Sequence, residues 1–218
     1  MRQLTWNDLL FLPYAARWTI VLSVASFAGG AALGVAIALM RVSERRWLRW
    51  VAIAYIRVFQ GTPLLLQLFL VFFGSEMLGA GLSPFVAAVL GLSLNAGAFL
   101  GEIWRGSIQA VPKGQTEAAR ALGLHRLQAF RLVVLPQALR AVVPPLGSQF
   151  ILLMLNSSIL SVISANELTA VAQDVQSRTF RAFEAYIVAA VIYFALSMLF
   201  SGAFAAIERF AFARPAGR

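Results

Sequence analysis

Five long stretches without a single Asp, Glu, Lys or Arg constrain this 218-residue chain more than any other feature. They contain 23, 18, 25, 26 and 21 residues and cover positions 18–40, 58–75, 77–101, 141–166 and 187–207. A bilayer core needs about 20 apolar residues in a helix, and a helix satisfies its own backbone in lipid. The sequence therefore predicts an all-α integral membrane protein with five transmembrane helices, the second of which extends back over residues 51–56.

The composition excludes several classes of function. The chain is 12% charged, whereas a soluble domain has about 25% charged residues. It has no cysteine and one histidine, His125, which excludes disulfides, a Cys nucleophile and a histidine-cluster metal site. It also lacks the Walker A pattern that binds ATP. Glu102, Glu117 and His125 are the acid–base candidates expected on the inner side, and nothing pairs them as a catalytic set. We expect neither enzyme activity nor a cofactor in this chain.

The basic residues predict how the chain is oriented in the membrane. Thirteen of the 18 Lys and Arg residues follow the first, third and fifth expected helices, within residues 41–49, 105–140 and 209–218. Basic segments stay on the cytoplasmic side, so the N-terminus is predicted outside and the C-terminus inside. This asymmetry accounts for most of the net charge of +9 without a nucleic-acid partner. Residues 1–13 are expected on the outer surface, as a short amphipathic helix ended by Pro13.

The polar segment of residues 105–140 carries a helical pattern. Residues 115–122 are rich in Ala, Glu, Arg and Leu, which favour helices, and Gly123 stands where a left-handed C-cap is expected. A second short helix is predicted over residues 127–135, just before Pro136. The segment therefore predicts a helix–turn–helix on the inner membrane surface. Since membrane helices tether both of its ends, it does not suit DNA recognition.

Within this segment, Glu117-Ala118-Ala119 is followed after three residues by Gly123 and after nine more by Val133-Val134-Leu135-Pro136. This pattern resembles the EAA loop of the permeases of ATP-binding-cassette (ABC) importers, and we call residues 105–140 the EAA loop. Every fixed position of the family's pattern matches, with Val133 where Ile is usual. The resemblance implies a coupling helix that docks on a separate cytoplasmic ATPase, and its contact residues would be Glu117, Ala118, Ala119, Gly123, Leu124 and His125. For Glu117 alone, stabilisation of a helix N-terminus is an alternative role.

Further segments are similar to the polar amino acid branch of this family: residues 55–74, 93–103, 106–115, 136–140 and 144–147. The resemblance implies a type I importer permease in the bacterial cytoplasmic (inner) membrane, forming one domain over residues 1–218. It also implies an ABC ATPase dimer that binds ATP and Mg, a second permease subunit, and an extracytoplasmic amino-acid-binding protein. Residues 167–184 are expected to form an outer loop or short helix on the side that meets this binding protein.

Two departures from the branch are visible. It often has Glu and Arg where this chain has Arg57 and Gln60, and Lys-Asp where this chain has Leu155 and Asn156. These differences leave open which amino acid is carried and whether this subunit has a substrate site of its own. They also leave open whether the second permease is identical or different.

Polar side chains within the apolar stretches are candidates for a substrate pathway, because they are costly in lipid unless bonded or hydrated. The candidate set is Asn95, Gln149, Asn156, Ser157, Ser158 and Ser161. The cluster at residues 156–158 is expected in the middle of the fourth helix; contact between helices is the alternative role. Arg57 and Glu102 are expected at inner helix ends, where Arg57 can snorkel and Glu102 can pair with Arg105.

Two G-x-x-x-G patterns, Gly30/Gly34 and Gly97/Gly101, allow helices to approach closely. They can serve contact with another subunit, or they can reflect the glycine content common to membrane helices. A different class of function, an ATPase-independent channel or secondary carrier for a small polar solute, also remains open. That interpretation leaves the pattern of the EAA loop unexplained.

Overall fold

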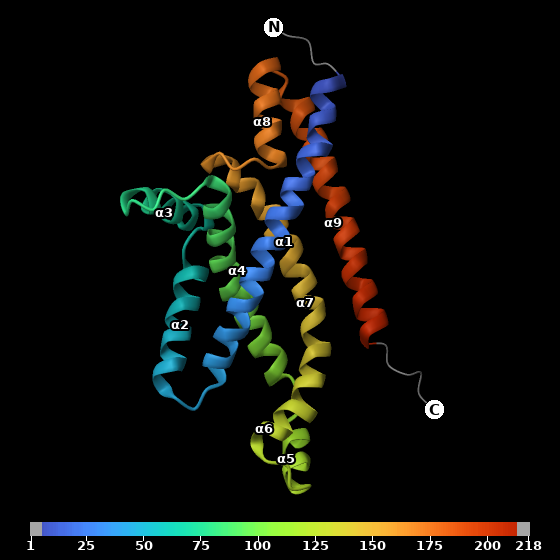
Figure 1. Cartoon of the computed structure of the whole chain (residues 1–218). Helices are drawn as coiled ribbons and strands as arrows, with labels where there is room; N and C mark the ends of the chain where they lie inside the picture. The colour runs from blue at the N-terminus through green and yellow to red at the C-terminus, as the bar shows by residue number, and fades with distance from the viewer. Residues whose placement is uncertain (1–5, 213–218) are drawn as a thin grey trace.

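A computed structural model describes residues 6–212, and all regular elements of this part of the chain are helices (Figure 1). They are α1 (Trp6–Val42), α2 (Arg46–Gly61), α3 (Leu64–Met77), α4 (Pro84–Gln109), α5 (Lys113–Ala121), α6 (Arg126–Ala129), a π-helical turn (Phe130–Val134), α7 (Leu135–Asn156), a 3₁₀ helix (Ser157–Ile163), α8 (Leu168–Thr179) and α9 (Ala182–Phe212). The long helices form an elongated bundle, with α8 at one end and α5 and α6 at the other (Figure 1). The all-helical prediction is confirmed.

Within residues 6–212, four continuous helical segments are long and apolar enough to cross a membrane. They lie in α1, in α4, in the stretch Arg126–Ile163 that contains α7, and in α9. Helices α2 and α3 also qualify as a pair, but they meet at an angle of 105°. The predicted number of five spans holds when this bent pair counts as one.

The bend between α2 and α3 replaces the continuous second helix that the sequence predicted. Thr62 is extended, at φ −121° and ψ 147°, because a residue before proline is disfavoured in the helical region. The Gln67 side chain donates hydrogen bonds to the carbonyl oxygens of Phe59 and Thr62, at 2.8 and 3.0 Å. Carbonyl groups left free by the break thus find a partner, as buried backbone requires.

Pro13 does not end a separate surface helix, so that prediction is wrong for residues 6–13; residues 1–5 lie outside the described part. Helix α1 continues through Pro13, although proline removes one backbone hydrogen bond. Leu12 is fully buried beside Leu168 of α8 and Ala189 of α9. Burial of this turn against two helices offsets the lost bond.

The third span also starts later than predicted, at Pro84 rather than near residue 77. Ser83 caps α4, since its hydroxyl accepts a hydrogen bond from the backbone N–H of Val86. Proline is favoured in the first turn of a helix after such a cap. The Ser-Pro pair was a start signal that the absence of charge over residues 77–101 obscured.

Among the described elements, helices α1 and α4 share the most extensive contact, and the glycines of both G-x-x-x-G patterns lie in it. A Cβ added at Gly30 would lie 2.7 Å from the Cβ of Ala96, and one at Gly34 would lie 2.7 Å from the Cβ of Leu100. Additions at Gly97 and Gly101 would be equally crowded. The two glycine patterns therefore pack against each other within this chain, because only residues without a side chain permit the two helices to approach so closely.

Candidate functional site

The central part of the EAA loop forms a helical hairpin of α5 and α6 at one end of the bundle (Figure 1). Gly123 has φ +85°, a conformation that glycine adopts without strain, and it follows the C-cap Leu122. The backbone N–H of Leu124 reaches back to the carbonyl of Ala119 at 3.2 Å. The predicted turn at Gly123 is therefore confirmed, and it closes the first arm of the hairpin.

His125 has a structural role in this turn that the sequence analysis missed. It caps α6: its Nδ1 accepts a hydrogen bond from the N–H of Gln128, and the Gln128 Oε1 accepts one from the N–H of His125. This reciprocal pair is a capping box. The spacing of His125 and Gln128 was the available signal, although histidine is an unusual residue in this position.

The second arm of the hairpin runs without a break into the membrane-spanning helix. The predicted helix over residues 127–135 was expected to stop before Pro136. Instead α6 passes through a π-helical turn into α7, with Pro136 in the first turn of α7. Proline is tolerated there because the local backbone adjusts by the π turn. The second arm of the hairpin and α7 therefore form one uninterrupted helical path.

The predicted contact residues of the first arm differ in exposure. Glu117 and Ala118 are exposed, whereas Ala119 is buried and packs within the hairpin. Among the residues that the structure describes, the Glu117 carboxylate makes neither an ion pair nor a hydrogen bond. Since Glu117 is the fifth residue of α5, it lies beyond the first turn, where a carboxylate gains most from the helix dipole. The geometry favours an outward contact for Glu117 and Ala118, and an internal supporting role for Ala119.

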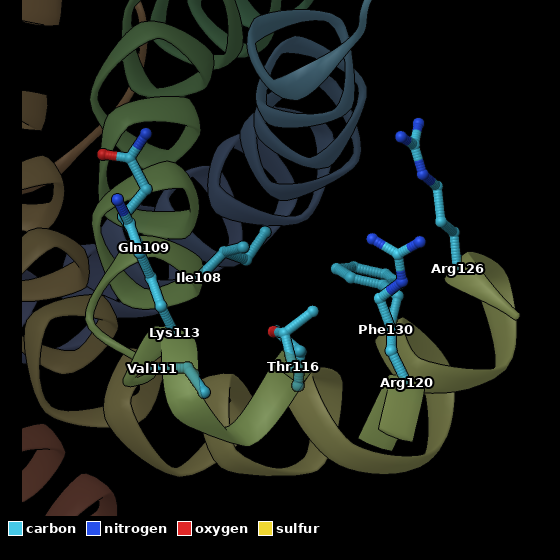
Figure 2. A pocket seen from close by; sticks show the side chains of 9 residues that line it. Ile108, Gln109, Val111, Lys113, Thr116, Arg120, Arg126 and Phe130 are labelled. Carbon is cyan, nitrogen blue, oxygen red and sulfur yellow. The ribbon is translucent and has the colours of Figure 1, made fainter. Parts of the chain in front are cut away.

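A cavity of about 620 Å³ lies beside the hairpin, and Figure 2 shows the side chains around it. Lys113, Arg120 and Arg126 line it, together with apolar side chains such as Phe130. Arg126 also forms an ion pair with Glu44, in the linker between α1 and α2. No carboxylate lines this cavity among the described residues, so it suits an acidic group of another molecule.

Just above the hairpin, Glu102 of α4 joins two arginines. Its carboxylate lies 3.1 Å from the Nε of Arg41 in α1 and 2.6 Å from an Nη of Arg105. The pairing with Arg105 was predicted from the helical spacing. The contact with Arg41 was not, because it joins residues that are 61 positions apart and no local pattern indicates it.

Arg57 does not lie at the start of α2, as the sequence analysis supposed. It lies 11 residues beyond Arg46 and about one turn before the end of α2 at Gly61. A cavity of about 230 Å³ is lined there by Arg57 and Gln60, with Arg41 and Glu102 as its other polar residues. The Gln60 side chain donates to the carbonyl of Ala98 in α4 at 3.3 Å.

Asn95 and Gln149 have different surroundings in the structure. The Asn95 Nδ2 donates to the Oε1 of Gln67 at 2.9 Å and to the carbonyl of Phe59 at 3.3 Å. It therefore joins α4 to the bend between α2 and α3. Gln149 is half-buried in α7, with no side-chain hydrogen bond among the described residues.

The cluster at residues 156–158 does not lie in the middle of a regular helix. Helix α7 ends at Asn156, and the chain tightens into the 3₁₀ helix from Ser157 onward. The Ser157 hydroxyl is buried and donates to the carbonyl of Met154 at 2.6 Å, whereas Asn156 is exposed and Ser158 half-buried. Ser161 accepts a hydrogen bond from Gln173 of α8 at 3.1 Å. These residues mark the change in helix type near the α8 end of the bundle.

Glu167 is a buried carboxylate that the sequence analysis did not single out. It caps α8, accepting hydrogen bonds from the N–H groups of Thr169 and Ala170 and from the hydroxyl of Tyr193 in α9. Burial raises the pKa of the Glu167 carboxyl, and these hydrogen bonds oppose the rise. The expected outer segment is therefore an anchored helix; Glu is not a common capping residue, so the sequence gave little signal for it.

Comparison with known proteins shows which family and which relatives this chain is similar to. Residues 30–212 match the family described as "Binding-protein-dependent transport system inner membrane component". The chain is 41% identical over 180 residues to a probable glutamine ABC transporter permease protein of Bacillus subtilis, covering 83% of each protein. It is 43% identical to the L-cystine transport system permease protein of the same organism, covering 88% of this chain and 82% of that protein. The glutamine transport system permease protein of Escherichia coli is 35% identical, with 94% of each chain covered.

Two solved structures share the fold. A chain from the crystal structure of an amino acid ABC transporter with histidines superposes with a TM-score of 0.88 and 38% identity, covering 95% of this chain and 99% of that one. An inward-facing methionine ABC transporter gives a TM-score of 0.83 at 22% identity, covering 97% and 100% of the two chains. The second likeness shows the fold alone.

Proposed function

Since the chain belongs to the family of binding-protein-dependent transport system inner membrane components, we propose that it is the permease subunit of an ABC importer for a polar amino acid. The relatives that this chain matches over more than four fifths of their length are named as amino acid transport permeases. The chain is a multi-pass protein of the inner membrane. The observation that carries the proposal is the exposed α5–α6 hairpin, whose second arm continues into α7.

The hairpin couples the chain to a separate ATPase dimer, which binds ATP and Mg. Ala118 permits close docking because its side chain is small and exposed, and Glu117 offers a carboxylate to a basic residue of the ATPase. When ATP closes the ATPase dimer, the hairpin moves, and the uninterrupted path through the π-helical turn moves α7 with it. The tight contact of α4 with α1 lets these two helices move as one body.

The hairpin end of the bundle faces the cytoplasm in this proposal, and the α8 end faces outward. The concentration of basic residues around the hairpin supports this orientation. An extracytoplasmic amino-acid-binding protein then delivers the solute at the α8 end. A second permease, identical or different, completes the pathway, since five spans are few for a transporter that works alone.

Reconstitution tests the proposal directly. The tagged chain and the subunits that co-purify with it are placed in vesicles, with ATP on the hairpin side and the binding protein on the α8 side. Uptake is measured for L-glutamine, L-cystine, L-histidine and L-arginine, together with ATP hydrolysis. We expect uptake of at least one of them that requires ATP. Equal uptake without ATP would support a carrier or channel instead and overturn the proposal.

A further inference from the structure

Arg57 is a charged residue in a membrane-spanning helix pair, and the one carboxylate that lines its cavity, that of Glu102, is already paired with Arg41 and Arg105. Its guanidinium makes no ion pair or hydrogen bond with any described residue, and its side chain is exposed in the isolated chain. A charge near the bilayer centre costs about 2.5–3.5 kcal/mol on insertion scales. Such residues usually face a water-filled space, so Arg57 is a candidate for function.

The position of Arg57 along α2 argues against a role at the membrane surface. Trp47 and Trp50 lie in the first turns of α2 and are 61% and 67% exposed, as tryptophans at a lipid–water interface commonly are. Arg57 follows Trp50 by seven residues, which is about 10 Å along a helix. It therefore lies deeper than the phosphate groups of a lipid leaflet would lie if Trp50 marks the interface.

The cavity beside Arg57 has an excess of positive charge. Arg41 and Arg105 share the single carboxylate of Glu102, and Arg57 adds a third guanidinium to this neighbourhood. Two guanidinium groups, those of Arg41 and Arg57, line the cavity with the one carboxylate, and Arg105 pairs with that carboxylate as well. Gln60 contributes a neutral amide, of which one N–H is used by the carbonyl of Ala98. Its carbonyl oxygen remains to accept a hydrogen bond from an ammonium group.

Polar residues of α4 connect this cavity to the bend on one side and to the hairpin on the other. Asn95, Glu102, Arg105 and Gln109 follow one another at intervals of seven, three and four residues, which puts them on one face of the helix. Asn95 contacts the bend, Glu102 lines the cavity of Arg57, and Gln109 lines the large cavity beside the hairpin. A polar face thus runs from the bend to the hairpin.

We propose that the cavity of Arg57 and Gln60 is a binding site for the carboxylate of the transported amino acid on its way to the hairpin side. Arg57 binds the carboxylate with two parallel N–H donors, and Gln60 accepts a hydrogen bond from the ammonium group. The volume of about 230 Å³ admits a small solute with some water, at about 30 Å³ per water molecule. This inference rests on the proposed function as an amino acid permease.

The first test compares charge variants in the reconstituted transporter. We expect Arg57→Gln to lower ATP-dependent uptake about tenfold or more, the size of effect expected from losing one charged hydrogen-bonding partner. ATP hydrolysis should remain, and Arg57→Lys should retain part of the uptake. The matched control is Arg49→Gln, two turns nearer the start of α2 and exposed, which should leave uptake unchanged.

The absence of cysteine from the whole sequence allows a second, sharper test. In an Arg57→Cys variant, aminoethyl methanethiosulfonate adds a cation at this position, whereas sulfonatoethyl methanethiosulfonate adds an anion. We expect the first reagent to restore uptake and the second not to. The best-transported amino acid should slow the labelling, and its α-amide should not. A Val58→Cys variant, on the neighbouring face of α2, should resist both water-soluble reagents.

The outcomes separate this inference from the proposed function. If the unchanged transporter takes up no amino acid with ATP, the proposed function fails. If it does, and Arg57→Gln transports equally well, the carboxylate site is wrong. Reaction of the Arg57→Cys variant with lipid-soluble maleimide alone would place Arg57 against lipid and overturn the site. Loss of a co-purifying second permease in Arg57→Gln would do the same, because Arg57 would then pair with that subunit.

Discussion

The α1–α4 contact and the α5–α6 hairpin both depend on small residues, but for opposite reasons. At Gly34 an added Cβ would lie 2.7 Å from the Leu100 side chain and 3.0 Å from the backbone nitrogen of Gly101, so the contact has no free space. At Ala118 the surface is open. A small residue in the first region fixes two helices together, and in the second it leaves room for another protein. Substitutions should therefore damage folding in one region and coupling in the other.

The largest effect is expected from Ala118→Trp in the hairpin. A large side chain on the docking surface should separate the chain from its ATPase, so ATP-dependent uptake should fall almost to background while the thermal stability of the chain stays unchanged. Uptake in vesicles and the unfolding temperature of the purified chain measure the two effects. Full uptake by this variant would show that Ala118 does not lie on the surface that contacts the ATPase.

Gly34→Ala should have the next largest effect, on stability. Overpacking of a close contact costs about 1–3 kcal/mol, and a rigid backbone atom lies among the neighbours of the new Cβ. The matched control is Gly202→Ala in α9, where nothing lies within 4 Å of the added atom; there stability should be unchanged or slightly higher. Thermal unfolding in detergent compares the two. Equal unfolding temperatures would show that the α1–α4 contact is not tight.

The stability that Glu167, the buried cap of α8, contributes should depend on pH. Because burial raises the pKa of this carboxyl above its ordinary value of 4.5, the folded state holds the proton more tightly than the unfolded state. Its contribution to stability is therefore fully present below about pH 4.5 and is lost as the pH rises through the folded pKa. As the pH rises through this range, the unchanged chain should lose stability relative to the Glu167→Gln variant. The opposite trend would contradict the assigned direction.

The smallest effect is expected for the ion pair of Arg126 and Glu44, which joins the hairpin to the α1–α2 linker. Both side chains are largely exposed, at 74% and 82%, and exposed pairs contribute less than about 1 kcal/mol. A double-mutant cycle with Arg126→Gln and Glu44→Gln should give a coupling energy within this limit. A coupling energy of several kcal/mol would mean that the hairpin is held as firmly as the α1–α4 contact.

Features of the sequence that act locally were sufficient to predict the all-helical fold, the turn at Gly123 and the pairing of Glu102 with Arg105. Each depends on neighbouring residues: the absence of charge, a left-handed backbone position, and a spacing of three residues in a helix. The EAA loop was found in the same way, through fixed spacing.

Features that depend on contacts between distant residues escaped prediction. Helix α1 continues through Pro13 because Leu12 is buried against α8 and α9. The bend after α2 needs the side chain of Gln67, and the partner of each glycine pattern is another helix. The position of Arg57 along α2 was misjudged because α2 begins at Arg46 and the chain bends after Gly61. The functional roles assigned within the EAA loop stay predictions.

Cross-linking from the hairpin tests the central claim most directly. A single Ala118→Cys variant, in a chain that otherwise has no cysteine, is purified with its co-purifying subunits and treated with a short thiol-to-amine cross-linker. The matched control is Gly202→Cys in α9. The account predicts a cross-link from position 118 to a soluble ATPase, identified by mass spectrometry, and none from position 202. No ATPase in the purified complex, together with uptake that needs no ATP, would contradict it.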